Sequence, residues 1–234
     1  MQATLKPRQP SESGLQGLIS CKKHRLINEH LEDSIPEYYS KNPVVRWLFR
    51  QRLTTAALFV ARTRCKSLVD LGCGDGSFVK HVLNSGLALS EFHAVDIHSD
   101  VVRLNEELKE CRFSCQNMDR TEFADAEFEA VTCLDVLEHF EDLSVPIREI
   151  RRILAAGGYL ITCEPTESGL YKLLRFVQKG HFSKPNARSI DYHFQNAASV
   201  EAALVESGFA AITRKTLPLP FPADLFHIIL FRKE

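Results

Sequence analysis

Three glycines and one aspartate give the clearest chemical signal in the sequence. Gly72, Gly74 and Gly76 alternate within VDLGCGDGSF, and Asp96 follows twenty residues after the last of them. Glycine permits a positive φ and a close approach of the backbone to a ligand, and a helix that begins here presents free N–H groups. A carboxylate at Asp96 can accept hydrogen bonds from both hydroxyls of a ribose. The combination indicates a site for a cofactor that carries a nucleoside.

A second group of reactive side chains follows an apolar run that ends at Leu134. Asp135, Glu138 and His139 are spaced so that a helix would place them on one face. Two carboxylates and an imidazole suit proton transfer or the coordination of Mg²⁺ or Mn²⁺. The alternative is that Glu138 and His139 only pack beside the cofactor. His193, in the later segment DYHFQ, is a candidate for the same cleft, against the alternative of an ordinary loop histidine.

These residues need elements that bring them to one edge of the fold. Short apolar runs predict five strands, at 67–72, 92–97, 111–116, 128–135 and 159–165. Helical patterns separate them, including segments at 76–86, 136–142 and 146–155. Strands that alternate with helices predict an α/β fold with a parallel sheet covered on both faces, in which ligands bind at the carboxyl edge.

The end of the chain has a different pattern. A helix at 197–207 ends at Gly208, and two strands, 209–216 and 225–232, follow with only a loop between them. Strands that are joined without a helix can pair antiparallel.

At these positions the sequence resembles the class I S-adenosylmethionine-dependent methyltransferases. The resemblance is carried by VDLGCGDGSF, AVDIH, FEAVTCLDVLEHFED and ILAAGGYLITCEP, and it covers about residues 65–234. It implies a Rossmann-like fold whose seven-stranded, mostly parallel sheet has an antiparallel last strand and helices on both faces. It also implies S-adenosyl-L-methionine as cofactor. Segment 128–142 is similar to the ubiquinone-biosynthesis O-methyltransferases, some of which are metal-assisted, and to small-RNA 2′-O-methyltransferases. Both have Glu where this chain has Asp135.

The resemblance also implies roles for individual residues. The glycine loop lies against the methionine part of the cofactor, Asp96 binds the ribose, and Ile97 packs on the adenine. The family positions that contact the adenine edge, just after the third strand, correspond to Asn117 and Met118. Leu134 contributes a backbone contact near the sulfonium. The cofactor residues implied in this way are Asp70, Gly72, Cys73, Gly74, Gly76, Asp96, Ile97, Asn117, Met118 and Leu134.

The function expected from these features is O-methylation of a small or lipid-like acceptor by in-line transfer, with His139 and Glu138 as the catalytic candidates. Asp135, Glu138 and His139 form the candidate metal set. The alternatives are methylation of carbon, 2′-O-methylation of RNA with a metal site, and a non-catalytic regulator that binds the cofactor. The formal net charge is −1, from 29 Lys and Arg against 30 Asp and Glu, which argues against a nucleic-acid partner.

The expected organisation is a flexible tail at 1–20, an N-terminal helical cap at 21–64 that contains an amphipathic helix at 43–62, and a methyltransferase domain at 65–234. The domain carries a lid insertion at about 166–195. Its apolar and basic stretch 170–188 suggests peripheral membrane contact, against the alternative of a helix packed on the domain. A monomer or homodimer is expected. The seven cysteines without a CxxC pair, and the absence of a long apolar run, favour the cytoplasm.

Overall fold

The computed structural model describes residues 42–97, 100–179 and 193–234. The predicted tail at 1–20, the first half of the predicted cap and much of the predicted lid therefore lie outside the described residues. Among the residues that are described, no helix is both long enough and apolar enough to cross a lipid bilayer.

A seven-stranded sheet forms the centre of the fold, in the order β3-β2-β1-β4-β5-β7-β6. The first five strands pair in parallel, whereas β7 runs antiparallel to both β5 and β6. This arrangement confirms the predicted fold class. The strands are β1 (Ser67–Leu71), β2 (Glu91–Asp96), β3 (Arg112–Cys115), β4 (Phe128–Leu134), β5 (Leu154–Pro165), β6 (Phe209–Pro218) and β7 (Asp224–Lys233).

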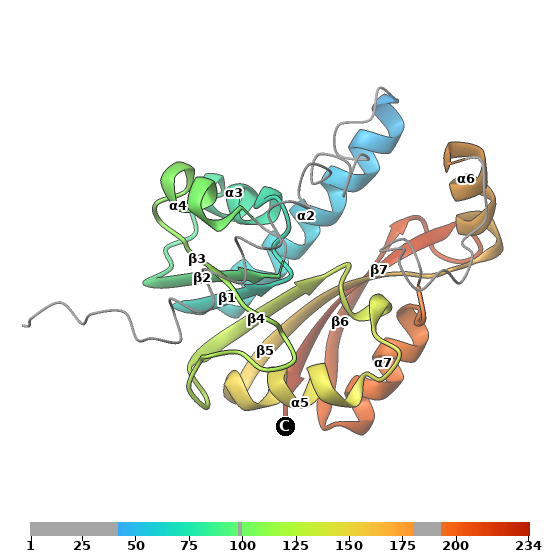
Figure 1. Ribbon diagram of the computed structural model, residues 1–234. Helices are drawn as coiled ribbons and strands as arrows, with labels where there is room; N and C mark the ends of the chain where they lie inside the picture. Colours follow the sequence, from blue (N-terminus) through green and yellow to red (C-terminus); the bar gives the residue numbers. More distant parts are fainter. Residues whose placement is uncertain (1–41, 98–99, 180–192) are drawn as a thin grey trace, which may run out of the picture.

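Helices cover both faces of this sheet (Figure 1). One face carries α2 (Pro43–Thr63), α3 (Ser77–Asn84) and α4 (Val101–Glu107). The opposite face carries α5 (Ser144–Ile153) and α7 (Ala197–Glu206). A further helix, α6 (Gly169–Lys179), leads away from the end of β5. Buried side chains form one apolar cluster on each face, as expected for a three-layer α/β fold.

Helix α2 belongs to the body of the domain. Asn42 caps its start by accepting a hydrogen bond from the backbone N–H of Val44 at 2.9 Å, and Pro43 occupies the first position, where no N–H is needed. Ala56 and Val60 are almost fully buried against the sheet. The predicted helix is therefore confirmed, and its second half packs in the core.

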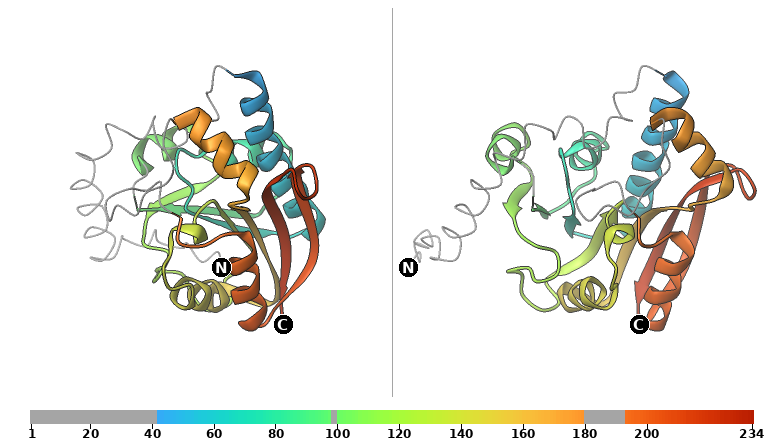
Figure 2. Two further views of the ribbon diagram at one scale, coloured as in Figure 1. Left: turned by 90° about the vertical axis from the view of Figure 1, so that its right-hand side faces the viewer. Right: turned by 45° about the vertical axis from the view of Figure 1, so that its right-hand side comes forward.

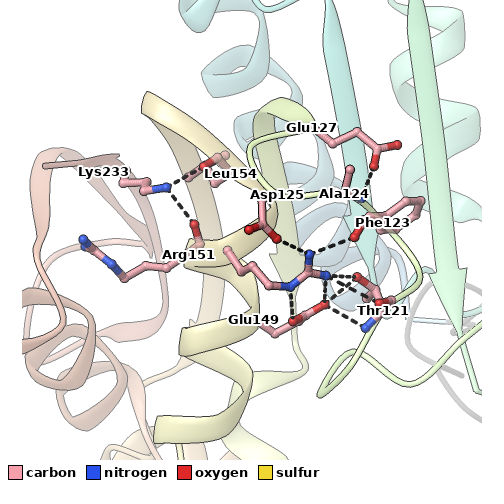
Figure 3. Close-up of polar contacts among 10 residues, drawn as sticks. Thr121, Phe123, Ala124, Asp125, Glu127, Glu149, Arg151, Leu154 and Lys233 are labelled. Atoms are coloured by element: carbon pink, nitrogen blue, oxygen red, sulfur yellow. Dashed lines mark hydrogen bonds and ion pairs between the residues drawn. The ribbon is translucent and has the colours of Figure 1, made fainter.

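Charged side chains secure α5 at the amino edge of the sheet (Figure 3). The guanidinium of Arg152 donates to Glu149 at 2.7 and 2.8 Å, and the hydroxyl of Thr121 donates to the same carboxylate at 2.6 Å. Lys233, near the end of β7, donates to the carbonyls of Arg151 and Leu154 at 2.7 and 2.6 Å. The last strand thus satisfies carbonyl groups that the end of α5 would otherwise leave without a partner.

Two predicted elements differ from the structure. The helix expected at 136–142 is a single 3₁₀ turn, η3 (Leu137–His139), and β5 begins five residues before the strand predicted at 159–165. The turn ends early because the backbone N–H groups of Phe194 and Gln195 donate to the carbonyl of Glu138 at 2.8 and 3.1 Å. That carbonyl is therefore committed to a distant segment instead of to the next helical turn.

Five cysteines of the described residues lie in the interior. Cys65, Cys73, Cys111, Cys133 and Cys163 are buried free thiols. Cys115, at the end of β3, is half-buried.

Candidate active site

The glycine loop joins the carboxyl ends of β1 and β2. The backbone N–H groups of Gly72 and Cys73 donate to the carbonyl of Val95 at 2.8 and 3.1 Å. The N–H of Gly74 donates to Oδ2 of Asp96 at 2.9 Å. The loop and the acidic residue predicted to bind one ligand are therefore held directly against each other.

The three glycines are required for different reasons. All three have a positive φ, between 52° and 79°. A Cβ on Gly72 would lie 2.3 Å from Cγ2 of Val136, and one on Gly76 would lie 2.8 Å from a methyl of Leu104, so packing excludes side chains at both positions. A Cβ on Gly74 would meet no atom within 4 Å. Gly74 thus has open space on the side where a side chain would lie, which leaves room for a ligand to approach the backbone.

Asp70 lies in β1, two residues before the loop. Its side chain is buried, and the hydroxyl of Thr132 on β4 donates to its Oδ1 at 2.6 Å. Burial raises the pKa of Asp70 to about 7, and the nearby carboxylate of Asp96 acts in the same direction. Asp70 therefore ties β1 to β4 beneath the predicted methionine-binding region.

The other predicted cofactor residues lie at the carboxyl ends of neighbouring strands. Asp96 ends β2 and is followed by Ile97, which is 45% exposed. Leu134 ends β4 and is half-buried. In the slot after β3, Asn117 is exposed, but the side chain of Met118 packs in the apolar cluster on the α5 face. Of that pair, only Asn117 presents its side chain to solvent.

Glu138, His139 and His193 form a compact cluster beside this edge. One potential ligand atom from each lies within 4.8 Å of those of the other two. The rings of His139 and His193 have centroids 5.2 Å apart, and Oε1 of Glu138 lies 4.0 Å from Nε2 of His139. The structure therefore places His193 beside Glu138 and His139.

Asp135 does not join the cluster with which the sequence grouped it. Its backbone is left-handed, with φ 58°, and its carboxylate forms an ion pair with Arg52 of α2. The guanidinium of Arg52 is also enclosed by the rings of Phe49 and Phe226, at 4.6 and 4.1 Å from their centroids. Because residues 135–139 do not form one helix, the three-residue candidate metal set is corrected to Glu138, His139 and His193.

Glu164 is a member of this region that the sequence analysis missed. It lies at the end of β5, it is 2% exposed, and within the described residues neither of its carboxylate oxygens has a hydrogen-bond partner. Burial, and then the neighbouring carboxyl of Glu138, raise the pKa of Glu164 well above its usual value. The sequence feature that could have identified Glu164 is its position at the carboxyl end of the apolar run YLITCEP.

Comparisons with known proteins agree with this architecture. Residues 69–162 match the family model of the methyltransferase domain. The structure is similar to the N-methyltransferase NodS of Bradyrhizobium japonicum solved with S-adenosyl-L-homocysteine, with a TM-score of 0.65, 16% identity, and coverage of 92% of this chain and 98% of that one. The matched segment runs from within β1 to within β5 and so includes the glycine loop and Asp96, and the fold is shared with that solved structure.

Two relatives match by sequence. The ubiquinone biosynthesis O-methyltransferase of Alkalilimnicola ehrlichii is 26% identical over 113 residues, which are 47% of this chain and 46% of that protein. An uncharacterized protein of Methanocaldococcus jannaschii is 33% identical over 119 residues, which are 50% of this chain and 49% of that protein. The chain thus spans about half the length of these curated relatives.

Proposed function

We propose that this chain is an S-adenosylmethionine-dependent methyltransferase that acts on a hydroxyl group of a small or lipid-like acceptor. The observation that carries the proposal is the pairing of Gly74 with Asp96. A Cβ at Gly74 would meet no atom within 4 Å, and the Gly74 N–H donates to Oδ2 of Asp96 at 2.9 Å. The sequence relative named as an O-methyltransferase supports oxygen as the accepting atom.

The bound cofactor supplies a methyl group that is activated by its sulfonium. The chain's own residues align the acceptor and remove its proton. The imidazole of His139, whose side chain is 35% exposed, takes the proton from the acceptor hydroxyl. Glu138 then stabilises the resulting imidazolium across the 4.0 Å between its Oε1 and Nε2 of His139.

A second candidate mechanism uses a divalent cation. Glu138, His139 and His193 offer one carboxylate and two imidazoles, which suit Mn²⁺ or a similar ion. Oε2 of Glu138 is buried and has no hydrogen-bond partner among the described residues, and a cation would supply the partner that this atom lacks. A cation held there would lower the pKa of an acceptor hydroxyl, so that its proton could pass to solvent without His139 as the base.

Thermal unfolding with S-adenosyl-L-homocysteine tests the cofactor assignment. The ligand should raise the Tm of the native chain, and Asp96→Ala should abolish that rise. Glu91→Ala is the matched control, because Glu91 lies at the opposite end of the same strand. A native chain whose Tm does not respond to the ligand would refute the proposal.

Methyl transfer to hydroxylated aromatic compounds, with and without an alkyl chain, tests the reaction. EDTA and restoration by Mn²⁺ separate the two mechanisms. Turnover that survives EDTA but is lost in His139→Ala supports His139 as the base. Turnover that EDTA abolishes and Mn²⁺ restores supports the cation. Methyl transfer to carbon alone would contradict oxygen as the accepting atom.

A further inference from the structure

Six large apolar side chains are exposed in three segments that are distant in sequence. Two lie at the start of α2, two lie on α6, and two lie in the connection between β6 and β7. We call them the apolar rim: Val44 (67% exposed), Trp47 (51%), Leu173 (55%), Leu174 (45%), Leu219 (61%) and Phe221 (83%). Single exposed apolar residues are common on proteins, but a cluster of them marks an interaction site.

Aromatic contacts show that the three segments meet. The ring of Phe226, at the start of β7, lies 5.5 Å from that of Phe49 on α2 and 5.8 Å from that of Tyr171 on α6. Both views in Figure 2 place α2, α6 and the β6–β7 connection at one end of the molecule. The apolar rim therefore belongs to one surface.

This surface borders the candidate active site. Phe226 pairs with Pro165 at the carboxyl end of β5, next to the buried Glu164. The hydroxyls of Thr166 and Ser168 donate to the carbonyl of Asp224 at 2.9 and 3.1 Å, which joins the segment before α6 to the start of β7. The segments that carry the apolar rim are thus joined to the carboxyl end of β5, where Glu164 lies.

The charged residues of the three segments that carry the apolar rim are all basic. Segments 43–52, 169–174 and 215–223 contain no Asp or Glu. They carry the exposed cations Arg50, Lys172 and Lys215. Apolar side chains surrounded by cations suit the surface of an anionic bilayer, because the apolar groups enter the lipid while the cations meet the headgroups. Trp47 fits the same surface, since tryptophan favours the membrane interface.

We propose that the apolar rim docks this chain on an anionic lipid surface, from which a lipid-like acceptor reaches the active site. The inference rests on the proposed function for the nature of the acceptor. It differs from the sequence-based expectation in its location, because that expectation placed membrane contact on 170–188 alone. Here α6 is one of three segments that share the contact.

The intrinsic fluorescence of Trp47, the only tryptophan in the chain, provides the test. Vesicles of phosphatidylcholine with phosphatidylglycerol should shift its emission to the blue and carry the protein with them on flotation. Vesicles of phosphatidylcholine alone should bind more weakly, and added salt should weaken binding to the anionic vesicles. Leu219→Ser/Phe221→Ser and Leu173→Ser/Leu174→Ser should each reduce vesicle binding by at least about tenfold, because each removes two apolar side chains from the contact.

Val205→Ser/Ile212→Ser is the matched control. These side chains are 51% and 52% exposed, on α7 and in β6 away from the β6–β7 connection, and their loss should leave vesicle binding unchanged. All variants should keep the Tm rise with S-adenosyl-L-homocysteine, so a failure of docking is distinguishable from a failure of the cofactor assignment. The proposal is overturned if vesicles produce no blue shift or if the control variant loses vesicle binding equally. It is also overturned if the blue shift occurs without vesicles and depends on protein concentration, because a second copy of the chain would then cover the apolar rim.

Discussion

Oε1 of Glu167 lies 2.6 Å from Nδ1 of His193. Glu167 holds this position with a left-handed backbone, φ 51°, which a residue with a side chain rarely adopts. The contact makes Nδ1 the nitrogen that donates to the carboxylate, and it leaves Nε2 of His193 available to the cluster with Glu138 and His139. Glu167 is therefore a positioning residue for His193.

Replacing Glu167 by Gln tests this role. The amide cannot hold the same charge-assisted bond, so we expect kcat to fall by about tenfold to a hundredfold. The Tm rise with S-adenosyl-L-homocysteine should stay, since the cofactor loop is untouched. Glu91→Gln is the matched control, because Glu91 makes a similar contact with His93 at 3.0 Å, away from the cluster. An equal fall of kcat in both variants would contradict the assignment.

The glycine loop predicts opposite defects for two neighbouring substitutions. Gly72→Ala should lower the free energy of unfolding by about 3 kcal/mol, because its methyl group collides with Val136 and the backbone is left-handed. Gly74→Ala should lower it by only about 1–2 kcal/mol, the cost of the backbone alone. Its methyl group would nevertheless occupy the cradle, so the Tm rise with S-adenosyl-L-homocysteine should vanish. Urea unfolding with and without the ligand measures both effects, and a retained rise in Gly74→Ala would place the cofactor elsewhere.

Arg52 balances the negative charge that surrounds it. Arg52→Met should cost about 3 kcal/mol in the free energy of unfolding, because the carboxylate of Asp135 loses its partner in a largely buried pair. Adding Asp135→Asn should recover part of that loss. The exposed pair of Arg103 and Glu107 on α4 offers a control, and Arg103→Met should cost less than about 0.5 kcal/mol. Equal losses in the two single variants would show that Arg52 contributes only surface charge.

Glu149 predicts an acid dependence of stability. Burial opposes its ionisation, but hydrogen bonds from Arg152 and Thr121 prevail and lower its pKa from the usual 4.5 to about 2. A carboxyl with a lowered folded-state pKa stabilises the protein above its unfolded-state pKa, and this contribution disappears as the pH falls from about 4.5 to about 2. Glu149→Gln should therefore be less stable than the native chain at pH 7, with the difference shrinking across that window. Urea unfolding at several pH values would contradict this if the two curves stayed parallel.

The sequence predicted the parts of the fold that local patterns control. The alternation of apolar runs with helical segments, and the glycine loop with Asp96, depend on residues near one another in the chain, so the parallel sheet and the position of the loop followed from them. The cluster of Glu138, His139 and His193 depends instead on contacts between residues that are distant in the sequence. The helix expected after Leu134 is cut short by hydrogen bonds from residues 194 and 195, and Asp135 is drawn away by Arg52. No local pattern contains either contact.

The position of Phe226 between α2 and α6 has a consequence for the order in which the protein is made. The glycine loop and Asp96 precede β7 in the chain and are synthesised before it. The aromatic enclosure of Arg52 waits for β7, the last strand, because Phe226 supplies one of its two rings. The ion pair of Arg52 with Asp135 therefore gains its second aromatic ring only after both of its own residues have been synthesised.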